Sequence, residues 1–324
     1  MSLRYVTLGG IVLDSVLSST GEFSPAGCGG NAMYSAASIR LWSDGVAAVG
    51  RAARDFPQTY LEDFARAGVD VSAVRWLDEP HERHSHVKFD SEGNRTSYNA
   101  SVSQAPDKVN EHSQTPAYVR YGSSPAAATE PVFDPVPADL PADYWQARGF
   151  HVAPMSHAAQ MAWAHELAAR KILFTVDPGR NTTGAQIGEL LRLTPVFLPS
   201  QEDVVRMFGQ IEMEQAIRQL AEMGPRVVGI KLGRRGSIVY DRDSATAWRI
   251  PVYPTDGKDP TGAGDSYCGG FLVGWVETGE ALEAALRATA SASFVVEDFD
   301  ARYALRFSRQ DAEARVRKLR LVME

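Results

Sequence analysis

The sequence is poor in cysteine. Only Cys28 and Cys268 occur in the 324 residues, with no C-x-x-C pair and no mixed cluster of cysteine and histidine. Two isolated cysteines exclude a disulfide framework and a structural zinc site of the usual spacing. They fit a reducing environment, and we therefore expect a cytoplasmic protein.

The sequence also lacks an excess of positive charge and a long apolar run. Acidic residues outnumber basic ones by 40 to 33, for a net charge of −7, so there is no basic field for nucleic acid and a small molecule is the expected partner. The opening residues, MSLRYVTLGGIVLD, hold one arginine and an apolar run that breaks at Gly9-Gly10. That run is too short for a membrane span and unlike a signal peptide, so it predicts a first buried strand and no membrane partner.

Two phosphate-binding motifs are missing as well. There is no GxxxxGK[ST] loop and no GxGxxG after the first strand. These absences argue against a P-loop kinase and against a dinucleotide-dependent oxidoreductase.

Apolar, strand-like runs instead alternate with longer amphipathic stretches. Examples are GVAAVGRA followed by FPQTYLEDFARAGV, and GFHVAP followed by SHAAQMAWAHELAARK. This order predicts βαβ units, and hence an α/β fold with a mostly parallel sheet covered by helices on both faces. With 44 % hydrophobic residues the chain can bury a sizeable core.

Residues 81–125 depart from this alternating pattern. HERHSHVKFD and NRTSYNASV flank Ser91-Glu92-Gly93, which predicts a hairpin in a small antiparallel element apart from the main sheet. From 104 to 143 prolines and alanines recur without a period, which predicts a long irregular connection or a partly mobile flap.

A glycine-rich stretch, DPTGAGDSYCGGF (259–271), leads into an apolar helical pattern. The helical spacing places Gly262-Ala263-Gly264 at a loop-to-helix junction and Asp265 in the first turn. Such a terminus has backbone N–H groups without intrahelical acceptors and can bind a phosphate oxygen. Asp265 either complements the helix dipole or takes a proton from an alcohol that attacks a phosphoryl group, and the residues alone leave both readings open.

This stretch resembles the C-terminal signature of the ribokinase/PfkB family of carbohydrate and nucleoside kinases. Other segments resemble the family in the same order: GGIVLD with Asp14, GGNAMYSAAS, AAVGRAARDFPQTYLEDFARAGVD, FTVDPGRN, VFLPSQEDVVRMFG and VVGIKLGRRG. The resemblance covers nearly the whole chain and is weakest between about 100 and 145. It implies a single ribokinase-like three-layer α/β/α domain over residues 1–324, with a small antiparallel β lid formed by segments near 12–28 and 81–122.

The resemblance implies an ATP- and Mg²⁺-dependent phosphotransferase that acts on a primary hydroxyl of a small sugar, sugar acid or nucleoside. In that case Asp265 is the catalytic base, and Gly262, Ala263 and Gly264 form the anion hole for the transferring phosphoryl. The alternative is a catalytically silent member that binds a sugar or nucleotide for regulation. The family also includes dimers formed through the lid, so a homodimer is a further expectation.

On the substrate side the resemblance points to Asp14, Gly29, Gly30, Asn31, Tyr34 and Arg95. Asp14 can accept from two vicinal hydroxyls, or it can be a turn residue after the first strand. Tyr34 stands where the family often has an asparagine, and it can offer a phenol, stack or pack. Asn31 can donate to the sugar instead or cap the helix, and Arg95 can pair with a substrate anion or be a solvated surface residue.

On the nucleotide side the resemblance points to Lys231, Gly233 and Gly236, in a segment that is also a plausible turn between two strands. Thr261 and Asp259 resemble residues near a monovalent-cation site, such as one for K⁺, although Asp259 can equally form a local Asx turn. The family's N-x-x-E motif, which orders the water shell of Mg²⁺, appears here as Ser200 and Asp203. Ser200 can equally be the N-cap of the following helix.

Overall fold

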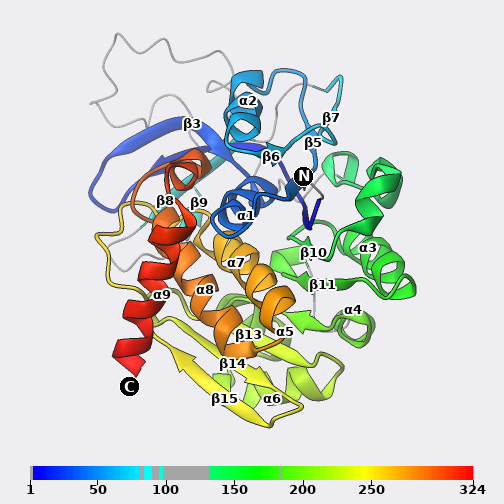
Figure 1. Cartoon of the computed structure of the whole chain (residues 1–324), viewed down its shortest axis with the longest axis vertical. Coiled ribbons are helices and arrows are strands. Elements are labelled where there is room, and N and C mark those ends of the chain that lie inside the picture. Colours follow the sequence, from blue (N-terminus) through cyan, green and yellow to red (C-terminus); the bar gives the residue numbers. More distant parts are fainter. Residues whose placement is uncertain are drawn as a thin grey trace.

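The structure is a computed structural model that describes residues 3–79, 84–89, 95–97, 131–181, 184 and 186–323. Its largest element is a nine-stranded central sheet (Figure 1). The strands lie in the order β15 (Thr246–Ile250), β14 (Ser237–Asp241), β13 (Val227–Lys231), β12 (Val196–Phe197), β11 (Leu173–Val176), β10 (Gly149–Val152), β1 (Tyr5–Leu8), β4 (Val46–Val49) and β6 (Val69–Asp70). In this order, all neighbouring strands from β13 through β6 pair in parallel. Only the β13–β14 and β14–β15 pairs are antiparallel. The predicted mostly parallel sheet is confirmed.

Helices cover both faces of this sheet. They are α1 (Asn31–Arg40), α2 (Gln58–Arg66), α3 (His157–Ala169), α4 (Ile187–Leu193), α5 (Gln201–Phe208), α6 (Met213–Glu222), α7 (Ala263–Thr278), α8 (Ala281–Val295) and α9 (Arg309–Met323). Successive strand residues point to opposite faces, so Tyr5 packs with α1, α7, α8 and α9, while Val6 packs with α3 to α6. Two hydrophobic cores, one on each face, produce the expected three layers.

A smaller sheet stands apart from the main one, at the upper left of Figure 1. Its order is β3 (Phe23–Gly29), β2 (Val12–Leu17), β8 (His84–Phe89) and β9 (Arg95–Ser97). The β2–β3 and β8–β9 pairs are antiparallel, and the central β2–β8 pair is parallel. The β8–β9 pairing confirms the predicted hairpin, whereas its turn, Ser91-Glu92-Gly93, lies outside the described residues together with most of the segment 81–122. A further pair joins β5 (Arg51–Ala52) to β7 (Arg75–Trp76).

The described end of the proline- and alanine-rich stretch is an irregular, packed connection. It consists of short 3₁₀ turns at Pro131–Phe133, Pro137–Asp139 and Ala142–Gln146. Asp139 accepts from Arg51 at 2.8 Å, and the Trp163 indole donates to the Pro135 carbonyl at 2.7 Å. Of the two alternatives for 104–143, residues 131–143 therefore fit the irregular connection, and 104–130 lie outside the described residues.

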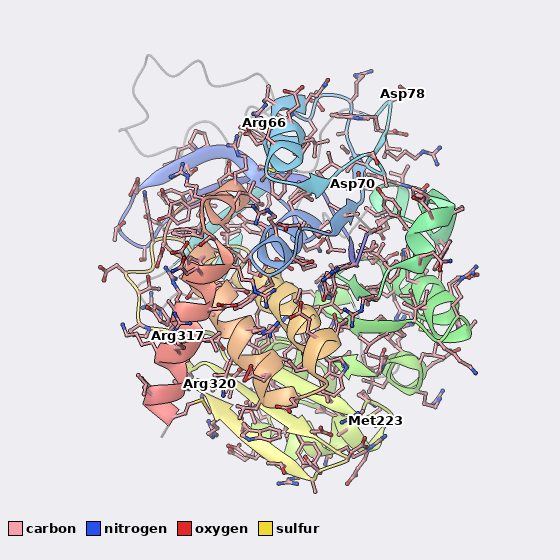
Figure 2. All side chains as sticks on the ribbon, viewed as in Figure 1. Arg66, Asp70, Asp78, Met223, Arg317 and Arg320 are labelled. Carbon is pink, nitrogen blue, oxygen red and sulfur yellow. The ribbon has the colours of Figure 1, made fainter. Side chains whose placement is uncertain are left out.

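Ion pairs attach the C-terminal helix α9 to α8. Arg320, labelled on α9 in Figure 2, pairs with Glu283 of α8. Arg315 pairs with Glu297, just beyond the end of α8, at 2.7 Å. None of the helices in the described part of the chain is both long and apolar enough to cross a bilayer.

Candidate active site

The candidate site lies along the carboxyl-terminal edge of the central sheet. Because the strands from β13 to β1 are parallel, the residues that follow them meet at one edge, where open α/β sheets bind ligands. Gly10 follows β1, Asp177 follows β11 and Ser200 follows β12, while Lys231 ends β13. The topology thus brings together residues that are far apart in the sequence.

Helix α7 begins at this site. Gly262 is its N-cap with a left-handed φ of 74°, Ala263 is its first residue, and Asp265 lies half-buried in the first turn. The predicted loop-to-helix junction is confirmed. Just before it the Thr261 N–H donates to Asp259 Oδ1 at 2.9 Å, so Asp259 does form the Asx turn that was one of its two alternatives.

Helix α1 lies beside α7 and begins at the same edge. Ser35 Oγ donates to the Asp265 carbonyl at 3.1 Å, and Ser38 Oγ donates to the Ser266 carbonyl at 2.5 Å. The ring of Tyr34 packs so closely on Gly262 that a Cβ at position 262 would overlap it. Two helix N-termini, each the positive end of a helix dipole, therefore converge on the site.

Tyr34 is buried, with 2 % of its surface exposed. Of the three roles considered for it, its position therefore favours packing. Burial, and then the negative charges of Asp14 and Asp259, raise the pKa of the Tyr34 phenol above its ordinary value. The hydroxyl is therefore neutral, and Asp14 and Asp259 lie close enough to influence it.

Asp14 lies within strand β2, so the alternative of a turn residue after the first strand is wrong. Its carboxylate packs directly on Gly29 of β3, where a Cβ would overlap it. The chain then turns through Gly30, the N-cap of α1, at a positive φ of 95°. Local turn preference offered a turn as one alternative for Asp14, but pairing with β3 and β8 extends the strand through it.

Asn31 does not cap α1, so that alternative is also wrong: Gly30 is the N-cap and Asn31 is the first helical residue. The Gly10 N–H donates to Asn31 Oδ1 at 2.6 Å, and Asn31 Nδ2 donates to the Pro154 carbonyl at 2.6 Å. The side chain thereby joins the loops that follow β1 and β10. One N–H of the amide remains for a ligand.

Gly233 and Gly236 lie in the connection between β13 and β14. The two strands form an antiparallel hairpin in which Lys231 pairs with Ser237, and Gly233–Arg235 is a 3₁₀ turn. The interpretation of this segment as a turn between two strands is confirmed.

Lys231 does not extend into this turn. Its Nζ donates to Asp177 Oδ2 and lies 3.6 Å from Cys268 Sγ of α7. Burial alone would lower the pKa of Lys231, but the Asp177 carboxylate raises it above its ordinary value, so the ammonium stays charged. Cys268 is fully buried, as expected for a core residue.

Asp177 is a site residue that the motifs did not single out. The available signal was the Asp-Pro pair directly after a buried strand, in FTVDPG. Asp300 was missed as well: its Oδ2 accepts from the Cys28 N–H of β3 at 2.9 Å, and Arg302 pairs with it at 2.6 Å. No local pattern predicts a contact between positions 272 residues apart.

Ser200 is the N-cap of α5. The Asp203 N–H donates to Ser200 Oγ at 3.2 Å, and Asp203 Oδ2 accepts from the Ser200 N–H and hydroxyl at 2.9 and 2.6 Å. Asp203 Oδ1 accepts from Arg206 at 2.9 Å. Within the described residues there is no group of three or more histidines, cysteines or carboxylates that could hold a metal ion. Arg95 begins β9, opposite Phe89, and its side chain lies outside the described part.

Comparison with known proteins agrees with this architecture. The chain is 28 % identical over 152 residues to a cytidine kinase from Thermococcus kodakarensis, an alignment that covers 46 % of this chain and spans only about half, 54 %, of that relative. Among solved structures it is similar to a Burkholderia thailandensis nucleoside kinase in complex with inosine (TM-score 0.71, 18 % identity, 98 % of both chains). It is also similar to a putative ribokinase II from E. coli in complex with ATP and Mg²⁺ (TM-score 0.70, 16 % identity, 98 % of this chain and 99 % of that one).

These structural likenesses establish a ribokinase-type fold. The model of the pfkB family of carbohydrate kinases matches residues 12–306, which is most of the chain. With the fold and the sequence in agreement, this chain belongs to the pfkB carbohydrate kinase family.

Proposed function

We propose that this protein transfers the γ-phosphoryl group of ATP to a primary hydroxyl of a small sugar, sugar acid or nucleoside. The observation that carries the proposal is the position of Asp265: a carboxylate in the first turn of α7, at the edge where the N-termini of α1 and α7 converge. A carboxylate repels phosphate and so weakens phosphate binding. Its presence at such a site therefore calls for a specific role. Accepting the proton of the attacking hydroxyl is such a role.

The start of α7 suits a phosphoryl group. Gly262 and Gly264 carry no side chain, so an anion can approach the backbone closely. The Gly264 N–H has no acceptor among the described residues, whereas the Ala263 N–H donates to the Pro260 carbonyl at 3.2 Å. We therefore expect Gly264 to supply the strongest hydrogen bond of the anion hole, and Ala263 to join only when a phosphoryl oxygen displaces that carbonyl.

The acceptor would lie between Asp14 and Asp265. The carboxylate of Asp14, held on Gly29, can accept from two neighbouring hydroxyls of one ring. That contact would place a primary hydroxyl of the same molecule at Asp265. The small sheet of β2, β3, β8 and β9 would cover the acceptor, and Arg95 of β9 is a candidate contact.

The residues present suit a nucleotide better than a metal held by protein ligands. Lys231 and the turn with Gly233 and Gly236 would lie along the nucleotide. Mg²⁺ is usually bound by substrate phosphates and water; when bound, it neutralises charge between the β- and γ-phosphates. Asp203 Oδ1, which accepts only from Arg206 in the described structure, would hold one of those waters next to Ser200.

A monovalent cation such as K⁺ is a further candidate. Thr261 Oγ1 is buried and has no partner among the described residues, and it lies next to the Asx turn of Asp259. A buried oxygen without a donor is a suitable cation ligand.

The test is a thermal-shift screen of the full chain against sugars, sugar acids and nucleosides, each with and without Mg²⁺ and ATP, followed by assay of ADP release. A ligand at 100 times its Kd adds about 2.7 kcal/mol to stability, which is readily detected. ADP release that depends on one acceptor supports the kinase. Binding of sugar or nucleotide without any transfer would instead establish the silent binding protein, an alternative favoured by the closed Ser200–Asp203 pair.

A further inference from the structure

The ammonium group of Lys231 lies under the first turn of α7. It would be 3.6 Å from a Cβ built on Gly264, and it is 3.6 Å from Cys268 Sγ one turn further along the helix. Only 11 % of the Lys231 side chain and 6 % of the Asp177 side chain are exposed. A permanent positive charge is thus buried against the backbone that forms the candidate anion hole.

Asp177 pairs with this ammonium although a strand lies between the two that carry them. Lys231 ends β13 and Asp177 follows β11, with β12 between them, so the lysine and aspartate side chains together bridge the separation of about 10 Å between the two strands. Asp177 is itself fixed: its Oδ1 accepts from the Gly179 N–H at 3.2 Å, and its carbonyl accepts from Gln160 at 2.6 Å. The carboxylate is therefore a rigid anchor.

One donor of the ammonium is left over. A lysine ammonium has three N–H donors. One is taken by Asp177 Oδ2 and a second faces Cys268 Sγ, which is a weak acceptor. Among the described residues the third has no acceptor. A phosphoryl oxygen bound at Gly264 would supply that acceptor.

We propose that Lys231 binds the transferred phosphoryl group together with the start of α7, and that Asp177 is the positioning residue that holds Lys231 there. This inference rests on the proposed function. A buried ion pair adds little net stability, because the cost of desolvating two charges roughly offsets their attraction. A charge placed in advance at a site where negative charge develops, by contrast, stabilises a transition state without any reorganisation.

The first test uses nucleotide binding and needs no acceptor. Calorimetry would compare the Kd of the non-hydrolysable ATP analogue AMP-PNP with that of ADP, both with Mg²⁺. If Lys231 contacts the γ-phosphoryl group, Lys231→Met weakens AMP-PNP binding by about 10- to 100-fold and ADP binding much less. Lys231→Arg, which keeps the charge, retains most of the preference for AMP-PNP. Lys318→Met, the same change on the exposed face of α9, alters neither Kd.

The second test separates positioning from folding. Asp177→Asn should lower kcat at least about tenfold, with a smaller change in the KM for ATP, in whichever acceptor reaction the wild type supports. The matched control is Asp241→Asn, which alters another buried carboxylate, paired with Arg226 at the opposite edge of the sheet. The double variant Asp177→Asn/Lys231→Met carries neither charge, so it should recover any lost thermal stability but not the preference for AMP-PNP.

The outcomes distinguish this inference from the proposed function. If Lys231→Met weakens the binding of AMP-PNP and ADP equally, or weakens neither, the proposed role of Lys231 is overturned, even if the wild type is an active kinase. A wild type that binds AMP-PNP but transfers no phosphate would overturn the proposed function, while the ratio of the two Kd values still decides on Lys231. A wild type that binds neither nucleotide overturns both.

Discussion

The ring of Tyr34 lies on Gly262, the residue at which α7 begins. This contact joins the two helix N-termini of the candidate site, because Tyr34 belongs to the first turns of α1. The position of the proposed anion hole thus depends on a residue 228 positions earlier in the chain, and hydrogen bonds from Ser35 and Ser38 to α7 reinforce that position.

Gly262→Ala should therefore disturb both stability and activity. A left-handed φ costs an alanine about 1–2 kcal/mol, and the new Cβ would also overlap the Tyr34 ring. Gly279 is a matched control, since it ends the same helix at a φ of 70° with open space around it. Urea denaturation should show a loss of about 1–2 kcal/mol for Gly279→Ala and a clearly larger one for Gly262→Ala. Equal losses would mean that the contact with Tyr34 carries no strain.

Asp265→Asn removes the proposed base but keeps the size of the side chain. We expect kcat to fall by about 10²- to 10⁴-fold, the usual contribution of a general base. The Kd values of nucleotide and acceptor should change little, because the base acts in the transition state. Rapid-quench measurement of a single turnover, beside calorimetry, would separate the two effects, with exposed Asp44→Asn as the control. Loss of acceptor binding in parallel with kcat would assign Asp265 to binding instead.

Asn31→Asp tests the link between the loops after β1 and β10. The introduced carboxylate can still accept from the Gly10 N–H, but it faces the Pro154 carbonyl with an oxygen instead of a donor. We expect the free energy of unfolding to fall by about 1–3 kcal/mol at neutral pH. The loss should shrink in acid, where the protonated carboxyl is again a donor. Gln215→Glu, on the exposed side of α6, is the control, and an unchanged stability in Asn31→Asp would show that the link is dispensable.

His151 should make stability depend on pH. It lies on β10, fully buried, with Nδ1 at 2.8 Å from Thr175 Oγ1 and with no partner for Nε2 among the described residues. Burial, aided by Lys231, lowers the pKa of His151 to about 3. Below pH 6.5 the unfolded chain then binds a proton that the folded chain does not, so stability falls as the pH falls.

Between pH 7 and 5 this single group should cost about 2 kcal/mol of unfolding free energy. Denaturation curves across that range would show a shallower dependence in His151→Gln than in the wild type. His165→Gln, at a side chain that is 56 % exposed, should leave the dependence as it is. Parallel curves for the wild type and His151→Gln would contradict a depressed pKa at His151.

Much of the architecture was predictable because its signals are local. Strands and helices differ in the period of their apolar residues, so the alternation of GFHVAP with SHAAQMAWAHELAARK predicted β10 and α3, and the same pattern elsewhere predicted a parallel sheet. The start of α7 was equally predictable, since glycines followed by helical spacing mark a helix N-terminus within a few residues.

Other features depend on contacts that no local pattern contains. Turn preference left a turn open as an alternative at Asp14, but pairing with two other strands places it within β2. Capping preference left a cap open as an alternative at Asn31, but Gly30 is the cap, and the approach of Gly10 and Pro154 gives the Asn31 amide two other partners.

The sequence by itself determined most of the main strands and helices and where the glycine-rich helix start lies, because those properties follow from residues a few positions apart. Only the tertiary structure decided which side chains meet there. Lys231 reaches Asp177, 54 residues away, because the strand order β13, β12, β11 places the ends of their strands together. Asp300 reaches Cys28 because the segment after α8 packs against β3. Such partners are selected by the packing of whole elements, and packing acts between residues that are distant in the chain.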